Sequence, residues 1–536
     1  MVDDLGRVGS GADVVIVGAG SAGVPLAARL SEDPARSVVL LDAGPELGAD
    51  LGTDPGVSGA GGALDADSLA AAYDPGRSDG RSVDLGGGRI VELRRGRVVG
   101  GSSAVNGAYF LRGRPEDFDR WQETTSADWS AEKVLASFVR LEHDLDLGHR
   151  PGHGSEGPMP VRRDLRLSRV SEAFFAASAG AGYRESDDLN GPTTADPGPG
   201  EFGVIPRNIG SSPPSPSVGP AAMGRGAVRV SVADAYLARH RDRANLTVRG
   251  GNTVRRVLVS DGRAVGIEID DGHGGRPVIE ADRVVLSAGA VGSAELLLRS
   301  GIGPADQLRR AGLEVVADLP VGAAIFDHPC IDLMFRPGPA VADPDSASFM
   351  QGALHLADGV EIMATRVPYG VATGTEPADD LLSLRVTLMR TLSRGRLTLH
   401  PPGVPSEPRL VYDSLSVAAD RALARGAVRV ACGLAAAPPM AVLVEQWFGP
   451  SPAELRSDAL LDLWIATHLG TAFHLCGTAP MGSARDPRAV VDPLLRVCGI
   501  EGLSVVDASV IPEPLSRGPA ATAIMIGEHA ATLFDR

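Results

Sequence analysis

Residues 13–23 read Asp13-Val14-Val15-Ile16-Val17-Gly18-Ala19-Gly20-Ser21-Ala22-Gly23, and they are the most informative segment of the sequence for the fold. Its apolar residues predict a buried strand that runs directly into a Gly-x-Gly-x-x-Gly turn, and residues 24–30 predict a helix. The first glycine permits the tight turn, the second lets the backbone approach a pyrophosphate, and the third lets the helix pack closely against the strand. The helix start also directs free N–H groups and a partial positive charge toward the phosphates.

A second apolar strand is predicted at residues 37–41, and it ends in Asp42. In dinucleotide-binding α/β folds, an acidic residue at this place holds the pair of ribose hydroxyls. A Gly-x-Gly-x-x-Gly sequence alone is weak evidence, because a glycine-rich turn also arises by chance. Placed between a strand and a helix and followed by this acid, it predicts a nucleotide-binding unit at about residues 12–45.

The bulk composition narrows the class of protein. A chain of 536 residues exceeds what one hydrophobic core usually supports, so we expect two domains or one large composite. The formal net charge of −16 argues against a nucleic-acid partner. We expect a reducing, cytoplasmic setting, because no C-x-x-C pair is formed by Cys330, Cys432, Cys476 and Cys498. We expect neither a secretory signal nor a transmembrane segment, because no apolar run is long enough.

The rest of the chain alternates predicted elements with glycine-rich loops. Residues 117–146 have a helical pattern, with predicted buried positions at Trp121, Trp129, Val134, Leu135, Phe138, Val139 and Leu141. Residues 46–90 predict a long loop with short elements, and residues 211–226 predict a surface loop or a lid over a pocket. A helix is expected at 231–240, and strands at 246–249, 254–260, 264–269, 283–287 and 505–512, with a hairpin turn at Asp261-Gly262.

Four later blocks carry candidate chemistry. Residues 96–107 form a second glycine-rich turn, which suits either a flat ring or phosphate lying on the backbone or an ordinary loop. Residues 283–290 form an apolar strand ending in small residues, which suits either a second approach to a cofactor or a tight strand–helix turn. His474 lies in a glycine-punctuated loop, where imidazole is suited to proton exchange, although a lone histidine is usually structural. Residues 518–522 begin a helix whose start is in a position to face a cofactor.

In this order the blocks resemble the glucose–methanol–choline (GMC) oxidoreductase family of flavoproteins, over nearly the whole chain. The resemblance rests on the N-terminal fingerprint, on residues 100–107, 286–304 and 506–509, and on Phe473-His474, Gly477-Thr478 and Met481-Gly482. It implies an α/β fold, with a Rossmann-like FAD-binding domain and a substrate domain of antiparallel sheet plus helices. The implied FAD-binding pieces are 12–154, 225–325 and 471–536, the last of which carries the catalytic loop, and the implied substrate-domain pieces are 155–224 and 326–470.

The resemblance also implies how the chain would hold FAD. Gly18, Gly20 and Gly23 would face the pyrophosphate, Asp42 the adenosine ribose, and Val254 the adenine; Gly101, Ser102, Asn106, Gly107 and Ala108 would lie along the isoalloxazine, and Asp507 near the ribityl chain. The other implied contacts are Ser21, Ala22, Ala43, Val99, Ala288, Ala508, Pro519 and Ala520. Some family members attach FAD covalently through a histidine in the Ser-Ser-x-Asn block. Because this chain has Ala104 there and no histidine nearby, we expect non-covalent FAD.

By the same resemblance, His474 is the catalytic base for a small-molecule alcohol. It would accept the hydroxyl proton while the adjacent C–H delivers a hydride to flavin N5, because an alkoxide is a far better hydride donor than an alcohol. The family usually has a second polar residue, Asn or His, before the last proline, but this chain has Gly518. Either Ser516 or Arg517 substitutes, or one base suffices. A lyase or a flavoprotein without redox turnover is therefore the alternative.

A finer resemblance concerns the substrate. Residues 474–478 and the ending Ser516-Arg517-Gly518-Pro519 are similar to GMC enzymes of mycofactocin systems. That subgroup implies a reduced peptide-derived cofactor as substrate and electron transfer toward a respiratory acceptor. It leaves peripheral contact with a membrane as an alternative to a purely cytoplasmic location.

Three other features receive structural interpretations. The histidines at 143, 149 and 153, with Glu142 and Asp144, match no common metal-site spacing, so we expect a solvated loop and no metal. His328, between Asp327 and Pro329, is expected to be structural, at the junction of the domains. Cys476 is expected to be a small packing residue, because no partner cysteine is visible.

Overall fold

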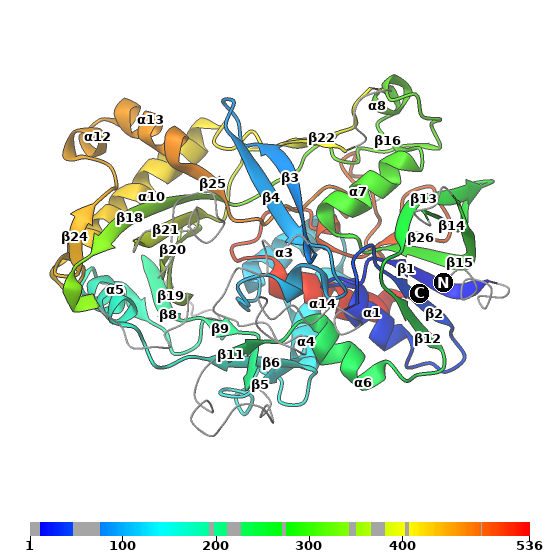
Figure 1. Cartoon of the computed structure of the whole chain (residues 1–536), viewed down its shortest axis with the longest axis horizontal. Helices are drawn as coiled ribbons and strands as arrows, with labels where there is room; N and C mark the ends of the chain where they lie inside the picture. The colour runs from blue at the N-terminus through cyan, green and yellow to red at the C-terminus, as the bar shows by residue number, and fades with distance from the viewer. Residues whose placement is uncertain are drawn as a thin grey trace.

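A computed structural model describes residues 11–46, 76–191, 198–211, 227–270, 275–341, 350–365, 381–401, 407–483 and 485–536. Almost all of the predicted loop at 211–226 lies outside these ranges. Two large sheets dominate the molecule and lie on opposite sides of it (Figure 1).

The first sheet is a seven-stranded α/β sheet built around the N-terminal fingerprint. Its strands are β1 (Ala12–Val17), β2 (Val38–Leu41), β12 (Leu246–Arg249), β13 (Thr253–Ser260), β14 (Arg263–Asp270), β15 (Val278–Leu286) and β26 (Leu503–Val505). Their order is β12-β2-β1-β15-β14-β13, with β26 beside β15. The strands β12, β2, β1, β15 and β26 run parallel, so their carboxyl ends share one edge. The predicted hairpin at Asp261-Gly262 is confirmed, with φ of +50° and +75°.

Helices cover this sheet because its central strands are apolar on both faces. They are α1 (Gly23–Leu30), α7 (Gly289–Arg299) and α14 (Ala520–Leu533). All three begin just beyond the carboxyl edge of the sheet, after the fingerprint turn, after β15 and near β26. This edge therefore collects three helix starts from segments hundreds of residues apart.

The second sheet is eight-stranded and almost wholly antiparallel. Its strands are β7 (Arg184–Glu185), β8 (Gly200–Val204), β18 (Pro329–Pro337), β19 (Met350–Leu356), β20 (Val360–Thr365), β21 (Leu382–Leu388), β24 (Val444–Trp447) and β25 (Leu469–Thr471). The order is β24-β18-β21-β20-β19-β8-β7, and β25 also pairs with β18. Helices α5 (Arg169–Gly180), α10 (Ala418–Ala436) and α13 (Asp458–His468) pack around it (Figure 1). The expected α/β fold with a second sheet-and-helix unit is confirmed, while the exact domain boundaries stay a prediction.

Smaller elements join the two sheets. A four-stranded sheet contains β3 (Ser78–Asp84), β4 (Ile90–Gly96), β22 (Arg396–Thr398) and β23 (Arg409–Val411), and a three-stranded one contains β5 (Glu142–Asp144), β6 (Met159–Arg163) and β9 (Pro206–Arg207). The other strands are β10 (Ile209–Ser211), β11 (Ala227–Arg229), β16 (Ile302–Gly303) and β17 (Ala317–Asp318). The other helices are α3 (Pro115–Thr124), α4 (Ala131–Leu141), α6 (Ala238–His240, preceded by a π-helical turn at Ala233–Leu237), α8 (Ala305–Arg310), α11 (Pro438–Ala441) and α12 (Pro452–Arg456).

Three expectations for local structure were wrong in part. The helical pattern at 117–146 is two helices and a strand, because Ser130 caps α4 with its side chain and breaks the run. Leu135 is 40% exposed, whereas Trp121 and Trp129 are fully buried as predicted. The expected strand at 505–512 ends at Val505, because the Asp507 carboxylate caps a 3₁₀ turn at Ala508–Val510. Most of the loop with short elements expected at 46–90 lies outside the described residues, and its described part contains the short strand β3.

Candidate active site

A cavity of about 360 Å³ lies where the carboxyl ends of β1 and β15 meet the second sheet. The predicted site residues that line it are Gly18, Gly20, Ser21, Ala22, Asp42, Gly101, Ser102, Asn106, Gly107, Ala288, His474, Asp507, Ala508, Pro519 and Ala520. Gly23, Ala43, Val99, Ala108 and Val254 do not line it. One cavity thus brings together residues from five separate stretches of the chain, and their individual contacts with FAD stay predictions.

The three glycines of the fingerprint are needed for different physical reasons. Gly18 has φ of +107°, and a Cβ there would lie 2.3 Å from the Ser287 carbonyl oxygen. A Cβ at Gly23 would lie 2.0 Å from the Gly18 oxygen, which fits close packing of α1 on β1. At Gly20, by contrast, the nearest atom would be 3.8 Å away, although this residue lines the cavity. Gly20 therefore keeps open a space that a Cβ would fill, as a bound pyrophosphate requires.

The polar groups around this space fit the nucleotide half of a dinucleotide. No side chain caps the first turn of α1 or of α14 within the described residues, and residues at both helix starts line the cavity. Uncapped helix starts attract anions. The Asp42 carboxylate accepts hydrogen bonds from the N–H groups of Ala19 (2.8 Å) and Gly44 (2.7 Å), and burial raises its pKa to about 6. Asp42 is thereby held at the cavity wall with an acceptor available for hydroxyl groups.

The carboxylate of Asp507 is already engaged in hydrogen bonds with other residues of the chain. Its carboxylate accepts from the Gly289 N–H (2.9 Å) and the Ser293 hydroxyl (2.5 Å), and its other oxygen accepts from the N–H (2.8 Å) and hydroxyl of Ser509. Burial raises the pKa of this carboxyl group. The side chain therefore ties the start of α7 to the segment after β26 at the cavity edge.

The loop that carries His474 is held by the buried residue Asp327. The Asp327 carboxylate accepts from the backbone N–H of His474 (2.6 Å) and from the Thr471 hydroxyl (2.5 Å), and Thr471 in turn accepts from the N–H of Phe473 (2.9 Å). Phe473 has φ of +59°, which is rare for a bulky residue. Burial raises the pKa of Asp327 to about 7. A strained residue fixed beside a candidate base is typical of an organised site.

His328, for which the sequence predicted a structural role, contacts the candidate base. Its Nδ1 lies 2.9 Å from Nδ1 of His474, and the two rings meet edge to face. Pairing of β18 with β25 and the bridge between Phe326 and Cys476 place these histidines opposite each other. The Asp-His pair at 327–328 was visible in the sequence, but only strand pairing brings it to the loop of His474. Its expected structural role stays a prediction, and the structure adds its contact with the candidate base.

Both histidines are electrically neutral at physiological pH. Burial, then the neighbouring His328 and Arg385, hold the pKa of His474 well below its usual range. Burial lowers the pKa of His328 to about 4. A neutral His474 has one ring nitrogen free to accept a proton. For that nitrogen to be Nε2, Nδ1 must carry its hydrogen and donate it to His328.

Gly518 faces the free edge of the His474 ring. A Cβ at Gly518 would lie 3.2 Å from Nε2 of His474 and 3.3 Å from Cε1 of Tyr109. The Ser516 hydroxyl is directed away, because it binds the Asp117 carboxylate at 2.7 Å. Arg517 is 2% exposed and does not line the cavity. Neither neighbour therefore replaces the polar side chain that Gly518 lacks.

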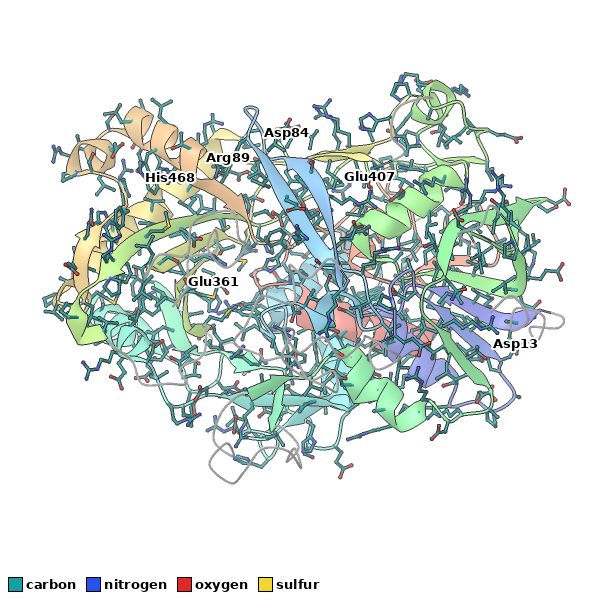
Figure 2. All side chains as sticks on the ribbon, viewed as in Figure 1. Asp13, Asp84, Arg89, Glu361, Glu407 and His468 are labelled. Atoms are coloured by element: carbon teal, nitrogen blue, oxygen red, sulfur yellow. The ribbon has the colours of Figure 1, made fainter. Side chains whose placement is uncertain are left out.

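The second sheet supplies the remaining wall of the cavity, and sequence reasoning named none of these residues. Besides Tyr109, they are Met350, Glu361, Met363, Arg385 and Thr387. Tyr109 donates its hydroxyl hydrogen to Glu361, which lies toward the middle of the molecule (Figure 2). Burial raises the pKa of both groups. No short motif marks such residues, because neighbouring strands bring them together.

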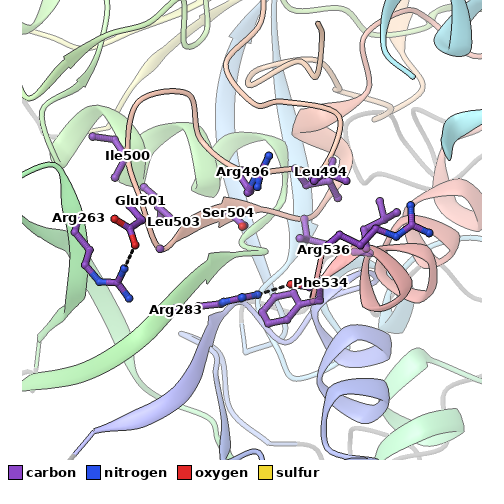
Figure 3. A pocket seen from close by; sticks show the side chains of 15 residues that line it. Arg263, Arg283, Leu494, Arg496, Ile500, Glu501, Leu503, Ser504, Phe534 and Arg536 are labelled. Carbon is purple, nitrogen blue, oxygen red and sulfur yellow. Dashed lines mark hydrogen bonds and ion pairs between the residues drawn. The ribbon is translucent and has the colours of Figure 1, made fainter. Parts of the chain in front are cut away.

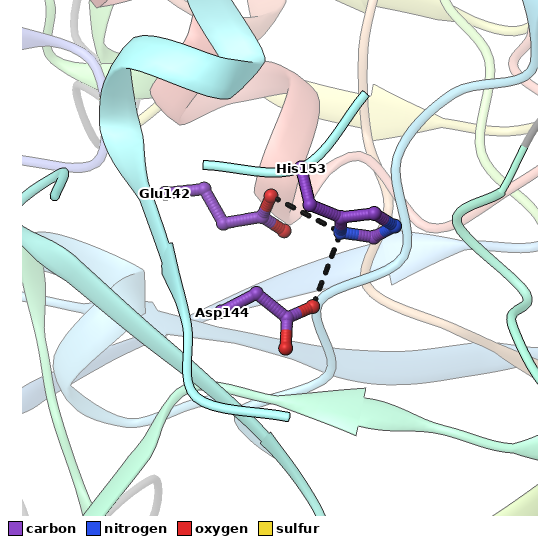
Figure 4. Close-up of side chains that lie close together, drawn as sticks. All are labelled: Glu142, Asp144 and His153. Atoms are coloured by element: carbon purple, nitrogen blue, oxygen red, sulfur yellow. Dashed lines mark ion pairs between the residues drawn. The ribbon is translucent and has the colours of Figure 1, made fainter. Parts of the chain in front are cut away.

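The expected solvated loop around His153 was wrong, because His153 is buried among acids (Figure 4). Its Nδ1 lies 3.2 Å from Asp144 and 3.4 Å from Glu142, and its Nε2 lies 2.8 Å from Asp188. Burial lowers the pKa of His153, but the hydrogen bonds to these acids outweigh it and raise the pKa to about 10. His153 is therefore a buried cation.

The geometry of this cluster also suits a metal ion, but its charges are already balanced. Glu142, Asp144 and His153 bring one ligand atom each within 4.8 Å of the others. However, Arg112 pairs with Glu142, and Arg163 binds both oxygens of Asp144 at 2.9 and 3.0 Å. Two guanidinium groups and a protonated imidazole already offset the carboxylates, so the cluster is a buried ion-pair network.

A second pocket lies beside the C-terminal helix and is rich in arginine (Figure 3). Its cations are engaged: Arg263 pairs with Glu501, Arg283 donates to the Phe534 carbonyl, Arg496 pairs with Asp492, and Arg536 pairs with Asp128. None of these four arginines is therefore left unengaged to bind an anion in this pocket. It is also remote from His474, which is absent from its lining.

Two further findings concern cysteines and membranes. All four cysteines are free, and Cys476 is buried, with a pKa that burial raises well above the usual value. A thiol in this state is not a nucleophile, so the packing interpretation stands. Within the described ranges, every helix is too short or too polar to cross a lipid bilayer.

Comparison with known proteins agrees with the resemblance to the GMC oxidoreductase family. Two family models, both described as GMC oxidoreductase, match residues 12–330 and 391–527. An uncharacterised GMC-type oxidoreductase of Rhodococcus erythropolis is 34% identical, over 98% of each chain. An oxygen-dependent choline dehydrogenase of Rhizobium etli is 33% identical, over 97% of this chain and 95% of its own. Among solved structures, pyridoxine 4-oxidase from Mesorbium loti is 28% identical, with a TM-score of 0.83 over 98% of this chain and 99% of its own.

Proposed function

The chain belongs to the GMC oxidoreductase family, and we propose that it oxidises a CH–OH donor in the cavity beside His474, with His474 as the base. It is an FAD-dependent oxidoreductase of the alcohol-oxidising type. When bound, FAD supplies the two-electron acceptor for the hydride. The observation that carries the proposal is the neutral, positioned imidazole of His474 at the wall of the same cavity as the fingerprint glycines.

The residues of the chain divide the work as follows. Gly18 and Gly101 let chain segments approach each other, Gly20 leaves room, and Asp42 offers an acceptor to the ribose. His474 accepts the hydroxyl proton at Nε2, and His328 fixes the ring through Nδ1. Removing that proton while the C–H bond breaks avoids a high-energy cation, and a positioned base typically contributes about 10²- to 10⁴-fold to the rate.

The manner of FAD attachment is also part of the proposal. The Gly-Gly-Ser-Ser block forms a 3₁₀ turn at Gly101–Ala104 that lines the cavity partly through Gly101 and Ser102. Its only side chains are hydroxyl and methyl groups, and neither is a nucleophile comparable to imidazole. We therefore expect denaturation of the protein to release FAD as an unmodified, free molecule. The measurement is the amount of free flavin in the supernatant after the denatured protein is removed.

The proposal is tested by mixing the purified yellow protein anaerobically with a panel of primary and secondary alcohols. Bleaching of the flavin absorbance by at least one alcohol, with formation of the matching carbonyl compound, is expected. If neither the alcohols nor a reduced peptide-derived donor changes the absorbance, a non-redox role such as a lyase is favoured instead. Peroxide release, compared with reduction of an artificial dye, then tells an oxidase from a dehydrogenase.

A finer proposal concerns the physiological donor. The ending at 516–519 and the block at 474–478 support a mycofactocin-type enzyme, in which the donor is a reduced peptide-derived cofactor and a respiratory carrier accepts the electrons. A cytoplasmic protein, with or without peripheral contact with the membrane, would suit that role. Reduction of the flavin by the peptide-derived donor, but not by simple alcohols, would support this finer proposal.

A further inference from the structure

The wall of the cavity opposite the fingerprint is a flat row of polar side chains on the eight-stranded sheet. Register places His355 of β19 opposite Glu361 of β20, Glu361 opposite Thr387 of β21, and Thr387 opposite Cys330 of β18. Residues directly opposite in an antiparallel ladder share one face of the sheet. Glu361 and Thr387, the middle pair of the row, both line the cavity.

Among the described residues, one polar atom of this wall lacks a hydrogen-bond partner, as do two atoms of His355, a member of the same row that does not line the cavity. Within the described part of the chain, the Thr387 hydroxyl has no hydrogen-bond partner, although Thr387 is only 1% exposed. The same holds for both ring nitrogens of His355, one of which lies 3.6 Å from Glu361. A buried polar atom without a partner is costly and needs an explanation. At a cavity wall, the simplest explanation is a polar group of the ligand.

The two cavity-lining groups have complementary capacities. The Glu361 carboxylate accepts hydrogen bonds, and one of its oxygens is already engaged by Tyr109. The Thr387 hydroxyl can donate as well as accept. A hydroxyl group of the ligand can donate to Glu361 and accept from Thr387 at once. A quaternary ammonium group can do neither, and an ammonium group can only donate.

The charges around Glu361 further disfavour a cationic ligand. Burial raises the pKa of Glu361 against the opposing effects of the Tyr109 hydrogen bond and of Arg517 and Arg385, and these two guanidinium groups already offset its negative charge. Two further carboxylates, Asp332 and Glu201, lie in this region together with the four guanidinium groups paired with them, Arg385, Arg517, Arg114 and Arg184. An additional positive charge would therefore gain little attraction here.

We propose that Glu361 and Thr387 form a subsite for a second hydroxyl group, so that the preferred donor is a neutral diol or polyol rather than a choline-like cation. The inference rests on the proposed oxidation at His474 and specifies its substrate class. The reacting carbinol would lie at His474, near Gly518, which also lines the cavity. The second hydroxyl would lie at the sheet wall, beyond Tyr109.

The test compares matched ligands that differ only in the second hydroxyl. Dissociation constants of 1,3-propanediol, 1,4-butanediol and 1,5-pentanediol are measured on the oxidised holoenzyme by the shift in flavin absorbance, against 1-propanol, 1-butanol, 1-pentanol and choline. We expect at least one diol to bind tenfold or more tightly than its mono-alcohol and than choline. Equal binding of every pair, or tightest binding of choline, would overturn the proposal.

Single substitutions test whether Glu361 and Thr387 cause the preference for diols. Glu361→Gln and Thr387→Val should each lower the diol preference at least fivefold, whereas the control Met363→Leu, a lining residue of the next row, should retain it. Flavin absorbance and melting temperature confirm that each variant is folded. An equal loss of preference in Met363→Leu would also overturn the subsite.

Binding and flavin reduction separate the two proposals. Selective diol binding without flavin reduction supports the subsite and contradicts alcohol oxidation. Reduction at equal rates by diols and mono-alcohols, with equal binding, supports alcohol oxidation and contradicts the subsite.

Discussion

The two walls of the cavity are built in different ways. The nucleotide wall is made of backbone: glycines at 18 and 101 whose missing Cβ atoms would collide with neighbouring main chain, and helix starts without side-chain caps. The opposite wall is made of side chains, such as Glu361 and Thr387, which strand register places in a row. Backbone contact demands particular residues at fixed spacing, whereas a row on a sheet demands only compatible neighbours. The first wall therefore tolerates little change, and the second is free to vary with the substrate.

The largest effect is expected for Gly18→Ala, which tests whether the nucleotide wall depends on close backbone contact. The added Cβ would lie 2.3 Å from the Ser287 oxygen, at a φ of +107° that disfavours any side chain. We expect a loss of more than about 3 kcal/mol of unfolding free energy, seen as insoluble or colourless protein. A variant that melts within 2 °C of the wild type (roughly 2 kcal/mol at this size) would show that the nucleotide wall is not limited by backbone contact.

His153→Gln probes a side-chain network away from both walls. Because its folded pKa of about 10 exceeds the unfolded value of 6.5, His153 contributes stability that is complete below pH 6.5 and lost as pH rises through 10. Chemical denaturation at pH 7 should show a loss of about 2–4 kcal/mol. The variant should also lose less stability than the wild type between pH 7 and pH 10.

The exposed neighbour His149 provides the control for that experiment. His149→Gln should leave both the stability at pH 7 and its pH dependence unchanged. Equal behaviour of the two variants would contradict a charged, buried His153.

His328→Phe tests whether the side chain in contact with Nδ1 of His474 contributes to the reaction rate. The variant loses the contact to Nδ1 of His474 and a neighbour that lowers the pKa of that base. We expect kcat to fall by between ~10- and ~10³-fold with KM little changed, and the acid limb of the pH–rate profile to move to higher pH. His328→Asn retains an acceptor and should recover part of the rate. An unchanged pH profile would reduce His328 to a packing role.

Gly20→Ala should give the smallest effect and the sharpest contrast with Gly18→Ala. Its Cβ would enter the cavity, with no protein atom closer than 3.8 Å. The melting temperature of the apoprotein should therefore stay within about 2 °C of the wild type, while FAD affinity falls about tenfold, or ~1.4 kcal/mol. Titration of the apoprotein with FAD measures this loss. Parallel loss of stability and affinity would mean that Gly20 serves the fold and not the ligand.

The difference between the walls also explains what could be predicted from the sequence. The fingerprint from Val17 to Gly23 fixed β1, α1 and the place of Asp42, because turn chemistry acts over a few residues. His474 was found because a loop histidine lay among recognisable glycine blocks. The contact of His328 with His474 was not predicted, because strand pairing brings together residues that are 146 positions apart. Glu361 was missed because it lies beside Tyr109, which is 252 positions away in the sequence. His153 was misjudged because its acidic neighbours include the distant Asp188.

The central claim, that His474 is the base, is tested most directly by single-turnover flavin reduction in His474→Ala. The variant should purify with bound FAD, because the nucleotide wall is untouched. Mixed anaerobically with a saturating alcohol that bleaches the wild type, it should bleach at least ~10²-fold more slowly. Bleaching within threefold of the wild-type rate would contradict the account.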